Sequence, residues 1–336
     1  MPSGSDVSVT LLRRTILRSV SRSFYLSIRL LPTKLRDPIA LAYLLARATD
    51  TIADATEISA AVRLEELGRL SGLIQGSVGA NARSSFASFA ALQKDEAERR
   101  LIEALPGCLA WLESLSDSDR ADIREVLGRI NEGQTLDVQR FANPAQVTAL
   151  ASAADLDRYT YLVAGSVGEF WTSVCFRHLS HFSERPRQEM LSLGEDYGKG
   201  LQLVNILRDA GADLRAGRCY LPADELRSLA VAPEELLAHG QRAEPLLRGW
   251  RERAERGMVA GLEYACAIQH WRVRLATALP VLIGARTLAL LRAAGPRAFT
   301  ERVKVSRAEV RQIVFQTART IAAPRSLRAS FARLSS

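Results

Sequence analysis

The stretch from Gln202 to Asp213, QLVNILRDAGAD, places two carboxylates one helical turn apart in an otherwise apolar segment. At about 100° per residue, its polar side chains fall within about 80° of one helix face; they are Gln202, Asn205, Asp209 and Asp213. Like charges four residues apart repel by about 0.2–0.5 kcal/mol on an exposed helix, and by more in apolar surroundings. The segment therefore needs a partner for its acids, and a bound cation would turn the repulsion into attraction.

A second stretch, YLLARATDTIAD, has the same design. Within about 60°, one helix face carries Tyr43, Arg47, Asp50 and Asp54. Carboxylate oxygens suit Mg²⁺, which is usually held by one or two carboxylates plus substrate phosphates. Two such pairs predict a diphosphate bridged by magnesium. The alternative is that each pair is a solvated helix face with an arginine of its own helix, Arg47 or Arg208, as its partner.

The composition predicts an all-α fold. Apolar residues make up 47% of the 336 residues and aromatic residues only 6%. Ala, Leu and Arg dominate, which favours helices, and runs of β-branched residues with period two are nearly absent. We expect an N-terminal helix and lead-in over residues 1–20, one helical domain over 21–322 and a loose basic tail over 323–336.

The formal charge is +8, and arginine carries the excess, since only Lys34, Lys94, Lys199 and Lys304 are lysine. Arginine is the better bidentate partner for phosphate oxygens, so the charge favours a polyanionic ligand or an anionic membrane surface. An arginine-rich genome would explain the same excess. Nucleic acid is not expected, because no basic stripe interleaved with aromatic residues is present.

The four cysteines are widely spaced and form no CxxC motif, so neither a zinc site nor a disulfide framework is predicted; they are Cys108, Cys175, Cys219 and Cys266. The N-terminus lacks a secretory pattern. The longest apolar stretch, residues 276–291, is interrupted by Pro280 and Arg286 and is too short for a bilayer span. We expect a soluble cytoplasmic protein whose contact with a membrane is at most peripheral.

Three further segments carry candidate site residues. Ser21, Arg22, Ser23 and Phe24 form a polar turn that could hold phosphate oxygens or serve only as a helix cap or bend. Arg218 lies just past the second aspartate pair, within reach of a phosphate.

The small residues Ala164, Gly165, Ser166 and Gly168 interrupt a helical pattern. They leave room for a long apolar chain or for close helix packing. Tyr159 and Tyr161 lie about one turn earlier and could donate a proton or face a cation.

Together SRSF, YLLARATDTIAD, DRYTYLVAGSVG and QLVNILRDAGADLRAGRCYLP resemble the squalene and phytoene synthase family in sequence, order and spacing. The resemblance extends from about Ser21 to Ala322. It implies the all-α isoprenoid synthase bundle, with the two aspartate pairs on opposite walls of a central cavity. ALPVLIGARTLALL and ERVKVSRAEV resemble squalene synthases more than phytoene synthases, and the chain is most similar to the bacterial type that lacks a C-terminal membrane anchor.

The resemblance implies head-to-head condensation of two farnesyl diphosphates to presqualene diphosphate, followed by NADPH reduction to squalene, with Mg²⁺ required. Its metal ligands would be Asp50, Asp54, Asp209 and Asp213. Its diphosphate ligands would be Ser21, Arg22, Ser23, Arg47, Arg208 and Arg218, with Phe24 in the same turn and Tyr43, Gln202 and Asn205 lining the polar site. Tyr159 is similar in position to the family's catalytic tyrosine. The expected protein is a monomer that contacts a membrane peripherally to release its product.

Two departures from the family pattern stand out. Ala53 and Ala212 replace acids found in many squalene synthases, which would weaken metal binding. No GxGxxG follows a strand, so NADPH has no recognisable nucleotide fold.

The alternatives are a family member that makes phytoene, dehydrosqualene or presqualene diphosphate without reduction, and a non-catalytic binding or assembly protein. The latter should have lost Asp or Arg positions that this chain keeps.

Overall fold

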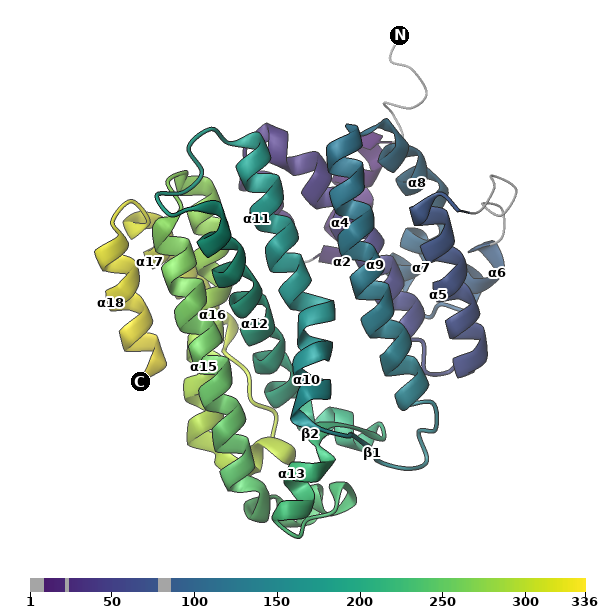
Figure 1. Cartoon of the computed structure of the whole chain (residues 1–336), viewed down its shortest axis with the longest axis vertical. Helices are drawn as coiled ribbons and strands as arrows, with labels where there is room; N and C mark the ends of the chain where they lie inside the picture. The colour runs from purple at the N-terminus through teal and green to yellow at the C-terminus, as the bar shows by residue number, and fades with distance from the viewer. Residues whose placement is uncertain (1–8, 22–23, 78–85) are drawn as a thin grey trace. The chain divides into compact units, whose positions relative to one another are not determined.

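A computed structural model of the chain describes residues 9–21, 24–77 and 86–336. The described residues belong to two compact units, whose bounds are Met1–Ala142 with Ser173–His178, and Asn143–Thr172 with Leu179–Ser336. Figure 1 labels the helices and strands of both. The predicted all-α class is confirmed, because nearly all ordered segments in the described residues are helices. The described exceptions are two short parallel strands, β1 (Thr148–Leu150) and β2 (Arg218–Pro222), and an isolated bridge between Ser183 and Ile268.

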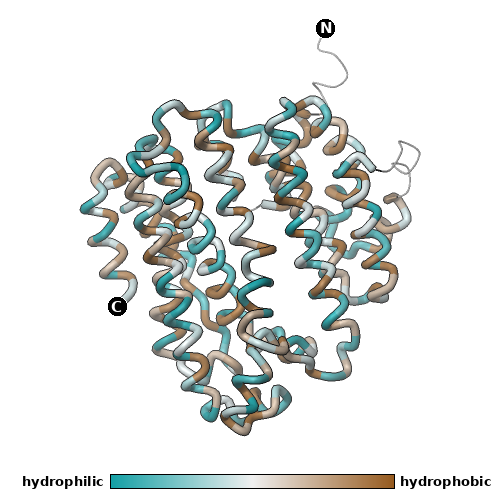
Figure 2. Tube along the Cα trace, in the orientation of Figure 1, coloured by the Kyte–Doolittle hydropathy of each residue, from teal (hydrophilic) through white to brown (hydrophobic). Residues whose placement is uncertain are grey.

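The first unit is a layered packing of helices around α4. Its elements are η1 (Leu12–Ile16), α2 (Leu17–Ser21), α3 (Phe24–Leu30), α4 (Thr33–Ala53), α5 (Ala60–Gln75), α6 (Phe86–Ala91), α7 (Glu96–Glu103), α8 (Leu105–Ser114) and α9 (Asp117–Arg140). Helix α4 contacts α5, α8 and α9 through buried side chains such as Leu41, Leu45 and Ile52. Hydrophobic and hydrophilic residues alternate along the traces of these helices (Figure 2), and the central helix α4 is buried around most of its axis, with five consecutive buried residues from Pro38 to Ala42. This packing fixes the end of α4 that carries Asp50 and Asp54.

The second unit is organised around the long helix α12. Its elements are α10 (Ala153–Thr160), η3 (Tyr161–Gly165), α11 (Ser166–His178, whose last turns belong to the first unit), α12 (Arg187–Arg215), α13 (Ala223–Ser228), η4 (Pro233–Glu235), α14 (Leu236–His239), η5 (Gly240–Ala243), α15 (Glu244–Ala267), α16 (Trp271–Ala294), η6 (Gly295–Phe299), α17 (Arg307–Thr320) and α18 (Pro324–Ser335). Helix α12 packs along α15 and against η3 and α16 (Figure 1).

The small-residue segment of η3 and α11 is a helix-packing surface. A Cβ added to Gly168 would lie 1.9 Å from the carbonyl oxygen of Gly194, and one added to Gly198 would lie 2.2 Å from that of Ala164. Both distances are far shorter than a van der Waals contact distance, so only glycine at these two positions allows η3 and α11 to approach α12 this closely. Of the two uses left open by the sequence, close helix packing is the one that the structure shows.

The residues expected to form a loose basic tail are folded. Helix α18 packs against α15, α16 and α17, with Leu327 buried. Arg328 donates to Glu263 of α15 at 3.0 Å. The expectation was wrong because it rested on charge alone, whereas Leu327 and Leu334 give this segment an apolar side that joins the core of the second unit.

One helical stretch among the described residues, Trp271–Phe299, has the length and apolar character that crossing a membrane requires. Most of its apolar part is buried inside the second unit. Burial of this kind is typical of a helix in the core of a fold.

Candidate functional site

The first aspartate pair lies at the end of α4. Asp54 caps the helix, and its backbone N–H donates to the carbonyl oxygen of Asp50 at 2.8 Å. The side chain of Asp50 is partly buried and accepts a hydrogen bond from Nε2 of Gln134, on α9, at 2.6 Å. The pair is therefore held by two packed helices of the same unit.

The charge of Asp50 is poorly compensated. Burial, and after it the charge of Asp54, raises the pKa of Asp50 to about 7, against the opposing effects of Arg47 and Gln134. Arg47 does not bond to either aspartate; its Nη2 donates to Glu98 at 2.5 Å. The arginine predicted to bind diphosphate is thus held beside the pair, and the repulsion between the two carboxylates remains.

The other predicted residues of the first unit lie near the start of the chain. Ser21 is buried and its hydroxyl donates to the carbonyl oxygen of Leu17, which is the helix-bonding use of this serine. Tyr43 donates to the carbonyl oxygen of Val20 at 3.4 Å, and burial raises the pKa of Tyr43. Phe24 begins α3. Arg22 and Ser23 lie outside the described residues.

The second aspartate pair, on α12, has the same spacing but is neutralised by arginine. Asp209 is half exposed and accepts from Nε of Arg208 at 3.0 Å. Asp213 is more deeply placed and accepts from Nη2 of Arg218, at the start of β2, at 2.6 Å. The hydrogen bond to Asp209 raises the pKa of Arg208, although burial acts against it. One turn earlier, Asn205 donates to Gln202 at the limiting distance of 3.5 Å.

The predicted catalytic tyrosine contacts the strand that carries Arg218, the partner of Asp213. Tyr159, on α10, stacks on Tyr220 with ring centroids 5.2 Å apart and an angle of 27° between the ring planes. Tyr220 is two residues beyond Arg218 on β2. Strand β2 therefore connects the ion pair of Asp213 and Arg218 to the ring of Tyr159.

Two residues of these sites were missed by sequence reasoning. Gln134 occupies the buried stripe of α9 between Ile130 and Val138, four residues from each. A polar residue in such a stripe requires a polar partner, and this was the available signal. Tyr220 was missed because the strand that presents its ring to Tyr159 was not predicted.

The residues present fit a hard divalent cation. Each pair offers carboxylate oxygens, the donors that Mg²⁺ prefers. The Oε1 atom of Gln134 is buried next to Asp50 without a hydrogen-bond partner among the described residues. No three His, Cys, Asp or Glu side chains of the described chain gather closely enough to hold a metal by themselves. A cation at either pair would thus need further oxygens, and phosphate and water oxygens are the usual source.

The arrangement of the helices matches known isoprenoid synthase folds. TcSQS in complex with E5700 superposes with a TM-score of 0.78 at 23% identity, covering 98% of this chain and 91% of that one. A dehydrosqualene synthase superposes with a TM-score of 0.63 at 22% identity, covering 94% and 97%. The squalene synthase HpnC from Alicyclobacillus acidocaldarius gives 0.60 at 19% identity, covering 89% and 97%. The predicted isoprenoid synthase fold is confirmed.

The sequence comparison identifies the family. The profile of the squalene/phytoene synthase family matches residues 17–309, and the chain belongs to this family. The bifunctional lycopene cyclase/phytoene synthase of Arthroderma gypseum is 30% identical over 246 residues, which are 72% of this chain and 40% of that protein. The squalene synthase of Eremothecium gossypii is 30% identical over 237 residues, 66% of this chain and 49% of that protein.

A third relative, the phytoene synthase of Rhodobacter capsulatus, is 28% identical over 239 residues, which are 70% of this chain and 58% of that protein. The matched part of the chain corresponds to between 36% and 58% of the length of these and other curated relatives. Relatives at similar identity thus carry different names, and family membership does not select the substrate.

Proposed function

We propose that the chain is a squalene synthase that condenses two farnesyl diphosphates to presqualene diphosphate and reduces this intermediate with NADPH to squalene. The observation that carries the proposal is the presence of both aspartate pairs, on α4 and α12, with Arg218 bonded to Asp213 and Tyr159 stacked on Tyr220 of the same strand. The C-terminal segments that resemble squalene synthases favour this product over phytoene.

The arginines are proposed to bind the diphosphate as it leaves. Departure of diphosphate develops negative charge on its oxygens, and guanidinium groups already in place stabilise that charge without reorganisation. Arg208 and Arg218 now bond to Asp209 and Asp213, so they can exchange a carboxylate for a phosphate oxygen. When bound, magnesium would supply further positive charge for the leaving group.

Tyr159 is proposed to assist diphosphate departure or a later proton transfer through its hydroxyl. Stacking on Tyr220 restricts the rotation of the Tyr159 ring. Tyr220 is thus a proposed positioning residue.

No residue is assigned to NADPH. Within the described chain, neither β1 nor β2 leads through a glycine-rich turn into a helix, as a dinucleotide-binding βαβ unit requires. The reductive step is proposed from the family resemblance.

The competing proposal is condensation without reduction, to phytoene, dehydrosqualene or presqualene diphosphate. This alternative is supported by the names of two similar proteins, one a phytoene synthase and the other a dehydrosqualene synthase. A non-catalytic role is disfavoured because the aspartates and arginines predicted for the site are retained.

The deciding experiment is incubation with farnesyl or geranylgeranyl diphosphate and Mg²⁺, with and without labelled NADPH, followed by product identification. We expect squalene with NADPH and presqualene diphosphate without it. Preference for geranylgeranyl diphosphate, or no transfer of label to any C30 product, would reject squalene synthesis. The Asp209→Asn variant serves as the inactive control in every arm.

A further inference from the structure

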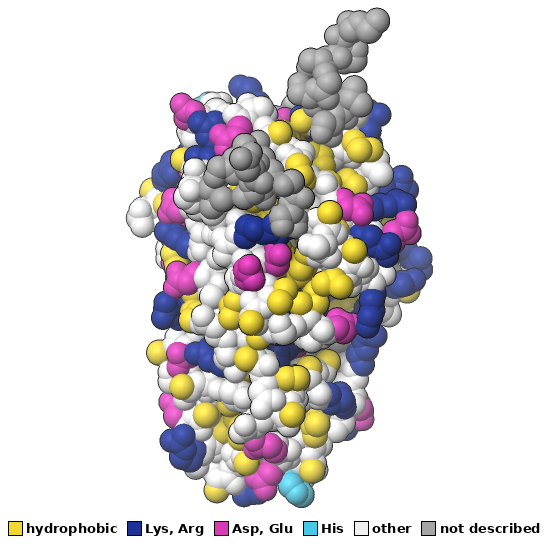
Figure 3. Space-filling model, turned by 90° about the vertical axis from the view of Figure 1, so that its right-hand side faces the viewer, with side chains coloured by type: hydrophobic (Ala, Val, Ile, Leu, Met, Phe, Trp, Pro, Cys, Tyr) yellow, Lys and Arg dark blue, Asp and Glu magenta, His cyan; other side chains and the backbone are white. Residues whose placement is uncertain are grey.

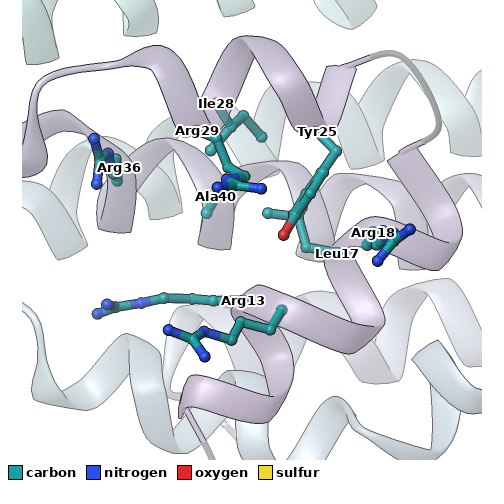
Figure 4. Close-up of a pocket in the computed structure, with 9 residues that line it drawn as sticks. Arg13, Leu17, Arg18, Tyr25, Ile28, Arg29, Arg36 and Ala40 are labelled. Carbon is teal, nitrogen blue, oxygen red and sulfur yellow. The ribbon is translucent and has the colours of Figure 1, made fainter.

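An arginine-lined hollow lies on the N-terminal helices of the first unit, apart from the aspartate pairs. Its volume is about 620 Å³, within the range of roughly 300–1,000 Å³ typical of ligand pockets. Residues of η1, α2, α3 and α4 line it: Arg13, Arg14, Leu17, Arg18, Tyr25, Ile28, Arg29, Arg36 and Ala40. Figure 4 shows the labelled arginines arranged around it, with Tyr25 and Arg29 close together and Arg13 opposite Arg36.

The positive charge of the hollow is mostly uncompensated. Asp37 pairs with Arg13, and Nε of Arg36 donates to the carbonyl oxygen of Leu31 at 2.8 Å. In contrast, no acidic side chain of the described residues pairs with Arg14, Arg18 or Arg29, and all three are exposed. Basic and acidic side chains are interspersed over the face of the molecule in Figure 3. Guanidinium groups gathered around one hollow repel each other, and an anion with several oxygens lowers that energy.

Apolar groups accompany the charge. Leu17 and Ile28 are buried at 2% and 3% exposure and contribute to the lining. Two leucines of the same N-terminal segments lie outside the lining and are exposed: Leu11, just before η1, exposes 55% of its surface, and Leu30, at the end of α3, exposes 38%. The guanidinium group of Arg29 lies 5.7 Å from the centre of the Tyr25 ring. Arginine, tyrosine and exposed leucine together are typical of a surface that meets the head groups and the first part of the acyl chains of a bilayer.

We propose that this hollow binds the phosphate of an anionic phospholipid, so that the segments η1, α2 and α3 rest on an anionic membrane surface. A free phosphate or diphosphate shares the charge but gives no reason for the exposed leucines. The phospholipid accounts for both. The proposal concerns a surface that the aspartate sites do not include, and it holds for any product of the enzyme.

The test compares two triple variants of the full chain in vesicle sedimentation. Arg14, Arg18 and Arg29 are changed to Ala in the first. In the second, Arg227, Arg248 and Arg256 are changed to Ala; these are also exposed and lack an ion pair with any described acid, but they belong to α13 and α15. Both variants lose three positive charges, so they differ only in where the charge is lost. Thermal unfolding checks that both fold.

We expect the wild type to bind vesicles of phosphatidylglycerol and phosphatidylcholine and not vesicles of phosphatidylcholine alone. Each arginine near an anionic surface contributes roughly fivefold in affinity, so the hollow variant should bind roughly 100-fold more weakly. The α13 and α15 variant should stay within about threefold of the wild type. Turnover of substrate dispersed in neutral detergent should be unchanged in the hollow variant.

Three outcomes would overturn the proposal. Equal losses of vesicle affinity in the two variants would show that the vesicles attract the protein only through its net charge. If the wild type bound no vesicles, the proposal that the hollow binds a phospholipid would be rejected. If inorganic diphosphate displaced the protein from vesicles far better than sodium chloride of equal ionic strength, and the hollow variant lost this effect, the hollow would be a site for a soluble phosphate.

Discussion

The aspartate pairs of α4 and α12 have the same spacing and opposite electrostatic surroundings. Asp50 is packed against Gln134, no arginine bonds to its carboxylate, and its pKa rises to about 7. Asp209 and Asp213 each receive a hydrogen bond from an arginine, Arg208 or Arg218. One helical motif thus yields a pair to which no arginine bonds, since Arg47 bonds to Glu98, and a pair in which each aspartate bonds to an arginine.

This difference suggests a division of roles. At the α4 pair, a cation would relieve repulsion that burial makes costly. At the α12 pair, the charge is already balanced, so a diphosphate that binds Arg208 or Arg218 would free a carboxylate for a cation. We therefore infer that the α4 pair favours the metal before substrate arrives, whereas the α12 pair favours it only together with a phosphate.

The largest expected effect is loss of turnover in Asp50→Asn and in Asp209→Asn. Removing either carboxylate would remove negative charge from the proposed cation site, and we expect turnover of farnesyl diphosphate with Mg²⁺ to fall on the order of 1,000-fold or more. Asp196→Asn, an exposed acid on another face of α12, is the matched control and should stay within about twofold of the wild type. A Mg²⁺-dependent, fully active Asp209→Asn enzyme would remove the α12 pair from the site.

The second prediction concerns stability and pH in metal-free protein. The pKa of Asp50 is raised from 3.8 to about 7 in the folded state, so its protonation stabilises the fold below about pH 4, and this contribution is lost as the pH rises through 7. Asp50→Asn should therefore match the wild type at pH 4 and exceed it at pH 8 by about 1–3 kcal/mol, allowing for partial exposure. Urea unfolding with EDTA measures the difference. Asp209→Asn should show no such gain, and a gain there would break the contrast between the pairs.

The third prediction isolates the contact that sequence reasoning missed. The hydrogen bond from Gln134 lowers the pKa of Asp50, so Gln134→Leu should raise this pKa and weaken Mg²⁺ binding at neutral pH. We expect roughly tenfold lower turnover at pH 7, with the acid limb of the pH profile moved upward by roughly 0.5–1 unit. Gln139→Leu, exposed on the same helix, is the control. An unshifted profile in Gln134→Leu would reduce Gln134 to a packing residue.

The smallest expected effect is on the stability of the α12 pair. Arg208 and Asp209 are adjacent, with side chains 37% and 50% exposed, and solvent-exposed ion pairs contribute only about 0–1 kcal/mol. Arg208→Gln should therefore change the free energy of unfolding by less than about 1 kcal/mol while it weakens diphosphate binding. Urea unfolding and diphosphate titration measure the two quantities. A large loss of stability would show that Arg208 supports the fold.

Prediction from the sequence succeeded where the signal was periodic or local. The helical character of the segments with Asp50 and Asp209 followed from the 3.6-residue period, and family membership followed from the motifs around them. It was wrong for residues 323–336, because a short amphipathic helix with many arginines looks like a solvated tail until its core partner is known. It left Ala164 to Gly168 undecided, because space for a ligand and space for a neighbouring helix have the same sequence signal.

The sequence by itself determined the fold class, the family and the spacing of both aspartate pairs, since these depend on backbone period and on the order of residues along the chain. Only the tertiary structure decided which acids are compensated. Gln134 lies 84 residues after Asp50 in the sequence and donates a hydrogen bond to it, and Tyr220, on strand β2, stacks on the ring of Tyr159. The pKa of a carboxylate depends on burial and on charges within a few ångströms, and these distances are set by packing between helices that the order of residues does not reveal.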